Sequence, residues 1–264
     1  MKIRVVTALL AAIALSGAAH AATESTSRFD GTSFYLGGGA AYVPRYPGSK
    51  EYRAAPLFNA SVLFKNGFFI DGNQGAGYQL KFTDNFYGIA ALGLDPGRAD
   101  KNDVARSGGD HLRGLGNIKS TALVNAGVGY NFSDRASVVV ELSQAVAHAG
   151  YGTTAHVAGH LTAWQGQRDG IDLDVAVHYG DADYNSTWFG ITPAQALRTN
   201  FAAYSPSAGI YAADASVTWS HQFNKHWFTR VTGGATRYMH DVANSPLVEA
   251  RTGYIAAASI NYRF

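Results

Sequence analysis

Three histidines in the second half of the chain, His156, His160 and His178, have the most evident capacity for chemistry. They occupy even-numbered positions, as do the carboxylates of Asp172 and Asp174. Alternate residues of a strand point to the same side, so on strands these five side chains share a face. Grouped imidazoles can bind Zn²⁺ or Cu²⁺, or titrate together near about pH 6. They also occur as ordinary polar residues bonded to water and carboxylates. We favour this second interpretation and predict no metal site.

The residues between these histidines predict how they face one another. Residues 167–170 favour a tight turn that pairs the flanking segments antiparallel. With that turn, we expect His160 to face Ala176 and His156 to face Gly180. The third histidine then lies diagonally between the first two.

The sequence carries no signature of an enzyme. It contains no cysteine, and it has no nucleotide-binding loop, HExxH motif or GxSxG motif. A lipid hydrolase in a membrane needs a serine and a histidine together on the lipid side near the rim. Here His148 is the outward histidine expected near a rim, and Ser143 lies on the opposite face of the same segment. We therefore predict no catalytic residues and no cofactor.

Charge excludes a further class of function. Lys and Arg total 21 against 19 Asp and Glu, and Lys2 and Arg4 supply the excess. Such a balance is not that of a basic nucleic-acid binder, so no nucleic-acid partner is expected.

The elements that position the polar residues are strands, because apolar residues recur with a period of two along nearly the whole chain. Many of the segments exceed the roughly 9–11 residues with which a tilted strand crosses a bilayer. Twelve are predicted, at 33–43, 54–64, 68–71, 76–82, 85–95, 118–132, 136–148, 154–165, 171–179, 209–223, 226–238 and 252–264.

The connections between the strands alternate in length. Tight turns are expected near 65–67, 83–85, 133–135, 167–170 and 224–225, and the longer loops are 44–50, 95–117, 185–208 and 239–250. All the tight turns then fall at one end, together with both termini. This layout is typical of an all-β fold, a transmembrane antiparallel β-barrel of about 12 strands with short periplasmic turns and longer extracellular loops. A soluble β-barrel or sandwich would need a more charged surface than 15% charged residues supply.

In such a barrel the polar face of each strand lines the interior. These side chains would either pair into an ionic network that plugs the barrel, which we favour, or line a narrow aqueous path. The lumen candidates are Lys119, Glu141, His156, His160, Asp172, Asp174, His178, Asp214 and Arg230.

Both ends of the chain indicate export to the outer membrane. Residues 1–21 combine two basic residues, an apolar run and small residues before Ala21, which predicts a cleaved Sec signal peptide. Residues 22–264 would form the barrel domain, with outer-membrane lipid around it. The last strand ends on Tyr262 and Phe264, an aromatic ending of the kind thought to be read by the barrel-assembly machinery.

Two of the longer loops have local structure of their own. Thr192 as N-cap, Pro193 at the first helical position and Gln195 two residues later predict a short helix over about 193–198. The loop at 44–50 contains two prolines and should be stiff. Each loop is either a recognition surface or a segment made rigid against proteolysis.

Short motifs spread from residue 35 to residue 264 resemble those of the MltA-interacting protein (MipA/OmpV) family. Individually each is short, but their shared order is fairly specific. They are the segment 37–49 with Tyr46, Pro47 and Gly48; Asp183 and Tyr184; the segment 188–192 with Phe189 and Gly190; residues 204–206; the segment 244–248 with Ser245 and Pro246; and the terminal 262–264.

The resemblance implies an outer-membrane barrel that is not an enzyme. It further implies a scaffold that links murein-remodelling machinery to the outer membrane, with a lytic murein transglycosylase and a murein synthase as partners. The alternative is a narrow porin-like channel for small solutes. The expected periplasmic turns are short, so partner binding would have to be weak or use the barrel rim.

Overall fold

The computed structural model describes residues 32–104 and 106–264. The predicted signal peptide at 1–21 lies outside the described residues. Among the described residues, no helix is long and apolar enough to cross a membrane.

Twelve of the described strands form a closed antiparallel barrel, in which each strand pairs with its neighbours in the chain and β1 pairs with β14. The barrel strands are β1 (Ser33–Pro44), β2 (Tyr52–Leu63), β3 (Phe68–Asp71), β4 (Gly75–Lys81), β5 (Phe86–Asp95), β8 (Thr121–Ser133), β9 (Ala136–Ala145), β10 (Thr153–Gln165), β11 (Asp169–Gly180), β12 (Gly209–Gln222), β13 (Trp227–Tyr238) and β14 (Thr252–Arg263). The predicted fold class and strand number are confirmed.

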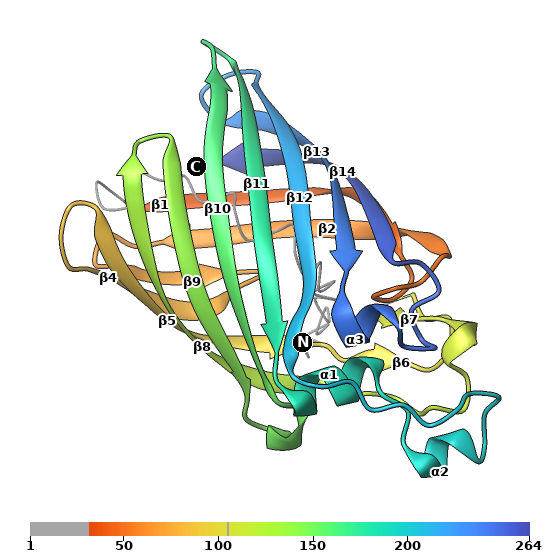
Figure 1. Ribbon diagram of the computed structural model, residues 1–264. Coiled ribbons are helices and arrows are strands. Elements are labelled where there is room, and N and C mark those ends of the chain that lie inside the picture. The colour runs from red at the N-terminus through yellow and green to blue at the C-terminus, as the bar shows by residue number, and fades with distance from the viewer. Residues whose placement is uncertain (1–31, 105) are drawn as a thin grey trace, which may run out of the picture.

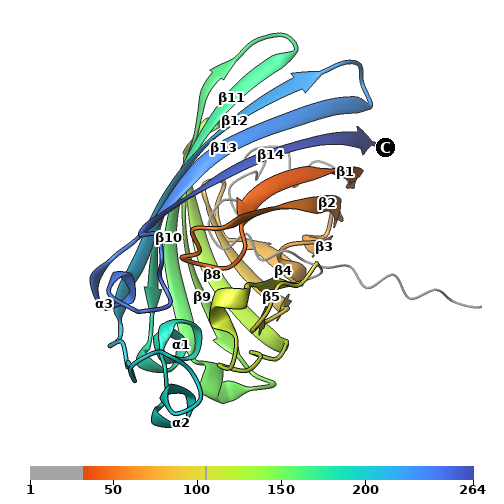
Figure 2. The ribbon, with the colours of Figure 1, turned by 90° about the vertical axis from the view of Figure 1, so that its right-hand side faces the viewer.

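The longer loops lie at one end of the barrel and carry the remaining elements. These are the parallel pair β6 (Arg98–Ala99) and β7 (Ser107–Gly108), the 3₁₀ turns η1 (Asp110–Leu112) and η2 (Ala149–Tyr151), and the helices α1 (Ala182–Phe189), α2 (Pro193–Ala196) and α3 (His240–Ala243). Figure 1 shows α1, α2 and α3 together at this end, and Figure 2 shows the C-terminus at the opposite end. The predicted segregation of long loops from tight turns is therefore observed.

The two faces of each strand differ as the period of two predicts. Along β11, Val175 and Val177 are 57% and 42% exposed, whereas the alternate residues Asp174 and Ala176 are each 8% exposed. An outer surface of exposed apolar side chains is costly in water but matches the hydrocarbon of a bilayer. We therefore assign the outer face to lipid and the inner face to the lumen.

A ring of outward aromatic side chains marks the tight-turn end. Such rings sit at the membrane interface, where an aromatic ring meets both hydrocarbon and head groups. The ring consists of Phe64, Phe68, Phe82, Phe86, Tyr130, Phe132, Trp164, Trp219, Phe223, Trp227 and Phe264. The terminal Phe264 stacks on Phe34 with ring centroids 4.5 Å apart, so the chain end is joined to the start of β1.

The seam between β1 and β14 depends on glycine. A Cβ added at Gly39 would lie 2.0 Å from the carbonyl oxygen of Ala258, and one at Gly37 would lie 2.1 Å from Oδ1 of Asn261. Both distances are shorter than any van der Waals contact. The glycine run of β1 therefore lets the first and last strands approach closely enough to close the barrel.

Two expectations about local structure are wrong. Lys119 is not a lumen residue, because β8 begins only at Thr121 and the exposed Lys119 belongs to the preceding loop. Residues 182–189 form a helix, although the predicted strand ends at 179 and a loop is expected from 185. This helix begins where the side chain of Asp181 accepts a hydrogen bond from the amide of Tyr184, which is the N-cap arrangement.

The assignment of the outer face to lipid predicts a large effect of charge there. Val175→Arg places a guanidinium at the middle of β11 on the lipid side and should lower the free energy of unfolding by about 2–4 kcal/mol. Equilibrium urea unfolding in lipid vesicles would measure it, with Val175→Leu as the size control. Equal stability of the Arg variant and the Leu variant would contradict the lipid-facing assignment.

Candidate functional site

A strip of ionisable side chains lines the lumen on β9 to β13. The strip contains Glu141, His156, His160, Asp172, Asp174, His178, Asp214 and Arg230, so eight of the nine predicted lumen candidates lie on the inner face. Within it, Glu141 pairs with His156 across β9 and β10, and Asp214 pairs with Ala176 across β11 and β12. The strip therefore runs across five consecutive strands on one wall of the barrel.

The histidines form two separate pairs with carboxylates. His160 Nδ1 lies 2.7 Å from Asp174 Oδ1, and its Nε2 lies 3.8 Å from Asp172 Oδ1. His178 Nε2 bonds directly to Asp214. A histidine that has a carboxylate partner is held in one ring orientation and one tautomer. These pairs therefore fix the side chains along the wall.

The predicted partners of the histidines on β11 are wrong by two residues. His160 faces Asp174 rather than Ala176, and His156 faces His178 rather than Gly180. There are two causes: the turn pairs Gln165 with Gly170, one residue out of the predicted register, and a β-bulge between Thr162 and Trp164 shifts the pairing by one more. The two facing rings are 5.9 Å apart between centroids.

No group of three or more metal-ligating side chains is present among residues 32–104 and 106–264. His160 and His178 each bind a different carboxylate, so the imidazole nitrogens do not converge on a common point. Arg230 reaches the same wall from β13, and its buried Nε has no hydrogen-bond partner. The strip is thus a mixed ionic lining.

The second candidate site is the loop assembly at the extracellular end, formed by residues 45–51, 96–104, 106–120, 181–208 and 239–251. Two apolar cores hold it together. One combines Tyr46, Leu112, Leu115, Ile191 and Leu247, and the other contains Ile118, Trp188, Phe189, Tyr211, Ala212, Tyr238, Val242 and Ala243. Both cores draw residues from several loops, so these loops fold as one unit.

Most of the predicted motif residues belong to this unit. Tyr46 is 2% exposed. Gly48 has φ +88° and packs against Val248, a backbone conformation that favours glycine. Pro47 lies between them in the same tight turn. The motif 46–48 thus shapes the first loop to fit against the last one.

The other motif residues join α1 to the last loop. Ser245 Oγ donates to the carbonyl of Phe189 at 2.6 Å, and the carbonyl of Pro246 lies 3.4 Å from His111 Nε2. A Cβ at Gly190 would lie 2.4 Å from the carbonyl oxygen of Ser186, so glycine ends α1 there. Tyr184 packs against the second core, and Asp183 is exposed in the first turn of α1, where the helix dipole favours a negative charge.

The predicted short helix after Ile191 is confirmed as α2. Thr192 and Gln195 form the expected capping box, and Pro193 is the first helical residue. The helix ends at Ala196, two residues before the predicted end. Gln195 also donates from Nε2 to the carbonyl of Leu115 at 2.7 Å, which ties α2 to the loop that precedes β8.

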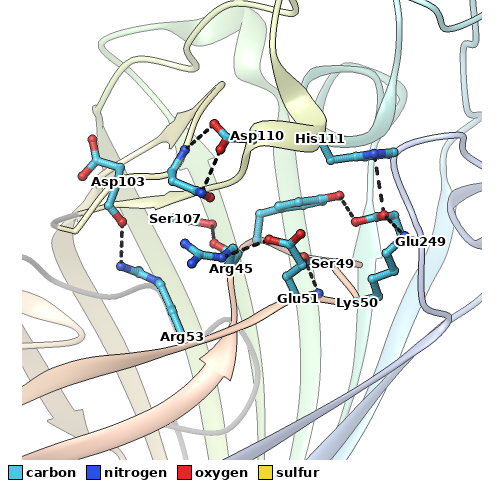
Figure 3. Close-up of polar contacts among 12 residues, drawn as sticks. Arg45, Ser49, Lys50, Glu51, Arg53, Asp103, Ser107, Asp110, His111 and Glu249 are labelled. Atoms are coloured by element: carbon cyan, nitrogen blue, oxygen red, sulfur yellow. Dashed lines mark hydrogen bonds and ion pairs between the residues drawn. The ribbon is translucent and has the colours of Figure 1, made fainter.

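Glu249 is the main polar junction of the loop assembly, and no sequence pattern predicts it. Its carboxylate accepts from Tyr46 Oη at 2.9 Å and lies 2.9 Å from Lys50 Nζ. His111 Nδ1 approaches within 3.6 Å from the loop between β5 and β8. Figure 3 shows Lys50 and His111 converging on Glu249. One carboxylate thus joins three loops, and we call this group the Glu249 junction.

Electrostatics within the Glu249 junction follow from these contacts. Burial raises the pKa of Tyr46, and its hydrogen bond to Glu249 raises it further, so Tyr46 stays a donor. Burial alone would raise the pKa of Glu249, but the hydrogen bonds from Lys50 and Tyr46 outweigh it and lower that pKa. The contacts of the junction therefore stabilise the ionised form of Glu249.

A buried cation also lies in this loop assembly. Arg98 is 3% exposed, and its guanidinium carbon lies 5.8 Å from the ring centroid of Trp188. Burial lowers the pKa of Arg98 to about 10. Its Nη1 donates to the carbonyl of Trp188, so α1 is anchored by both the ring and the main chain of one residue.

The sequence is similar to a known family and to known outer membrane proteins. The family model described as MltA-interacting protein MipA matches residues 36–264. The outer membrane protein OmpV of Vibrio cholerae is 26% identical over 215 residues, which are 70% of this chain and 81% of that protein. Outer membrane protein Omp26La of Vibrio anguillarum is 27% identical over 88 residues, which are 33% of this chain and 34% of that protein.

Solved structures with a similar barrel are more distant in sequence. A structure described as KdgM porin is 12% identical, with a TM-score of 0.48, and the match covers 87% of this chain and 99% of that chain. One described as NanC porin is 8% identical, also with a TM-score of 0.48, and the match covers 87% of this chain and 98% of that chain.

The Glu249 junction predicts a pH-dependent loop assembly. A carboxyl whose pKa is lowered in the folded state stabilises that state above its ordinary pKa of 4.5, and the stabilisation is lost as pH falls through the lowered value. Glu249→Gln should therefore speed pepsin cleavage of the loops at about pH 5 but not at about pH 2, where the wild-type carboxyl is protonated too. The rate ratio of variant to wild type at each pH cancels the pH dependence of pepsin itself.

Glu51→Gln is the matched control for this experiment, because Glu51 pairs with Arg45 at 3.2 Å in the same region but has a side chain that is 60% exposed. It should leave the cleavage rate close to that of wild type. A ratio for Glu249→Gln that stays at one throughout would show that Glu249 does not hold the loops.

Proposed function

The chain belongs to the MltA-interacting protein MipA family of outer-membrane β-barrels, and from this premise we propose that it is a non-enzymatic scaffold that holds a murein-remodelling partner at the outer membrane. The observation that carries the proposal is the match of residues 36–264 to a family described by its interaction with MltA. A lytic murein transglycosylase is the proposed first partner, and a murein synthase is the second.

The periplasmic rim is the proposed contact surface. Its turns are short, so it offers little area against the roughly 800 Å² that each partner contributes to a typical stable complex. Four of its five turns carry an exposed basic residue: Lys65, Arg135, Arg168 and Lys225. Exposed rim charges act mainly on association rate and orientation. We infer a weak, electrostatically guided contact with an acidic surface of the partner.

The lumen supports a second candidate, a narrow channel for small cations or polar solutes. The side chain of Asp172 is 20% exposed, and those of Asp174 and His160 are each 11% exposed, although all three point into the barrel. Solvent therefore has room beside the carboxylates of the strip. A water-accessible wall of carboxylates favours cations over anions.

Charge reversal at the rim tests the scaffold. Replacing all four basic residues by Glu should abolish most chemical crosslinking to a lytic transglycosylase in outer-membrane preparations, since the steering charge is inverted. The matched control swaps Lys and Arg at the same four positions, keeps the charge, and should retain the crosslink. Full crosslinking by the reversed variant, or none by wild type, would refute the proposed contact.

Single-channel recording in planar bilayers tests the second candidate. Wild type should give steady steps with a preference for cations, and Asp172→Asn combined with Asp174→Asn should lower that preference. Thr232→Val is the uncharged lumen control, because Thr232 bonds to Thr218 on the inner face of β13 and carries no charge. A folded, electrically silent wild-type barrel would eliminate the channel and leave the scaffold untouched.

A further inference from the structure

The barrel wall is incomplete on one side. Strand β3 has four residues and pairs with β2 only at Ser61, Val62 and Leu63. Residues 52–59 of β2 have no partner strand on that side in the described chain, although they pair with β1 on the other. Strand β5 likewise continues beyond Leu92, where its pairing with β4 ends. We call residues 52–59 of β2 the open edge.

The open edge lies at the depth of the membrane. The hairpin of β3 and β4 starts at the aromatic ring with Phe68 and turns after Asp71. A tilted strand rises about 2.5 Å per residue, so the hairpin tip stands only about 12 Å above the ring, near the middle of an apolar band about 25 Å tall. Strand β2 continues to Tyr52, which stacks on Tyr42 at the other interface. The break therefore faces the outer leaflet.

The open edge is poorly suited to hydrogen-bond with another strand. The amide of Gly72 donates to the carbonyl of Ala60, so the even-numbered residues of β2 turn their backbone groups toward the break. Pro56 is one of these residues and has no N–H to donate. Proline at such a position is a common protection of sheet edges against pairing. A partner strand or a second copy of the chain is thus disfavoured.

An apolar patch lies just inside the open edge. Ala41, Val43 and Ala55 form a buried cluster on the lumen face of β1 and β2, with Leu57 and Ile255 packed against it. On the outside, Phe58 and Leu94 flank the break and are 63% and 60% exposed. Apolar surface thus lies on both sides of the break, and it differs from the ionic strip on β9 to β13.

A buried arginine whose guanidinium bonds to main-chain carbonyls lies at the upper end of the break. Arg53 is 8% exposed, and its Nη1 donates to the main-chain carbonyl of Asp103 at 3.1 Å (Figure 3). The same Nη1 also donates to the carbonyl of Val104 at 3.1 Å. Its Nε has no partner. Neighbouring Arg45 is instead paired with Glu51, and Arg106 with Asp103. Arg53 follows directly on Tyr52, and the Tyr42–Tyr52 stack places it at the level of lipid head groups.

We propose that the open edge admits one outer-leaflet lipid with a phosphate head group, whose acyl chain reaches the apolar lumen patch while its phosphate binds Arg53. An acyl chain matches the apolar surfaces on both sides of the break, and a guanidinium is a preferred partner of phosphate. Unpaired backbone groups cannot face hydrocarbon without large cost, so a polar head group or its water also satisfies the upper part of the edge.

Photocrosslinking from inside the lumen tests this proposal. The full chain is refolded with benzoylphenylalanine at Leu57 in vesicles that contain phosphatidylglycerol, and lipid adducts are counted by mass spectrometry. Ser143 on β9 is the matched control position, because it also faces the lumen and each of the two residues lies six or seven residues from the periplasmic end of its strand. Several-fold more lipid adduct at 57 than at 143 is expected; equal adducts would overturn the proposal.

The role of Arg53 is tested in the same assay. Arg53→Gln should lower the adduct at 57 several-fold, and Arg53→Lys should retain most of it, because a point charge still attracts phosphate. In vesicles of digalactosyldiacylglycerol, which has no phosphate, Arg53→Gln should have no effect. Loss of the adduct on adding millimolar inorganic phosphate would indicate a site for the free anion instead of a lipid.

A further result would overturn the proposal, and a second method tests it independently. A protein adduct at 57 in place of a lipid adduct would mean that a strand or a second copy occupies the edge. Every variant is first checked for the heat-modifiable migration of a folded barrel. Native mass spectrometry of the unmodified chain released from detergent gives an independent measurement, in which wild type should retain phosphatidylglycerol and Arg53→Gln should not.

Discussion

The structure depends on one constraint: a backbone amide or carbonyl within a bilayer must be hydrogen-bonded inside the protein. Twelve strands meet it by closing on themselves, with β1 paired to β14 along eight residue pairs. Glycines at the seam allow the close approach that this closure needs. The same constraint makes the break beside β2 conspicuous, because there the ladder stops within the apolar band and the remaining backbone groups need another partner.

The polar side chains are distributed by the same constraint. Lipid excludes them from the outer face, so Asp172, Asp174 and Asp214 point inward and meet the histidines of neighbouring strands. The charges gather on β9 to β13, whereas β1 and β2 carry the apolar cluster of Ala41, Val43 and Ala55. The lumen thus has an ionic strip on one wall and an apolar patch on another. The first suits solvated ions or an internal network, and the second lies beside the open edge.

The extracellular loops are held together by the burial of apolar side chains away from water. Tyr46, Leu112 and Leu247 come from three different loops and are almost completely buried together. Glu249 adds a charged junction at the surface of this core, with Tyr46 and Lys50 as partners. The periplasmic rim consists of short turns that carry basic residues. It therefore has less structure of its own than the extracellular end of the barrel.

The sequence by itself determined the barrel, its twelve strands, the lipid and lumen faces, and the capping box at Thr192, because each follows from residues adjacent in the chain or repeating with a period of two. It did not determine which lumen residues meet, since the register at the turn and one bulge near Ala163 together moved the partner of His160 from Ala176 to Asp174. It also misplaced Lys119, whose position depended on where loop packing ends and β8 begins. Only the tertiary structure brought Glu249 to Tyr46 and left Arg53 at an unpaired edge, because those positions depend on contacts between residues far apart in the chain.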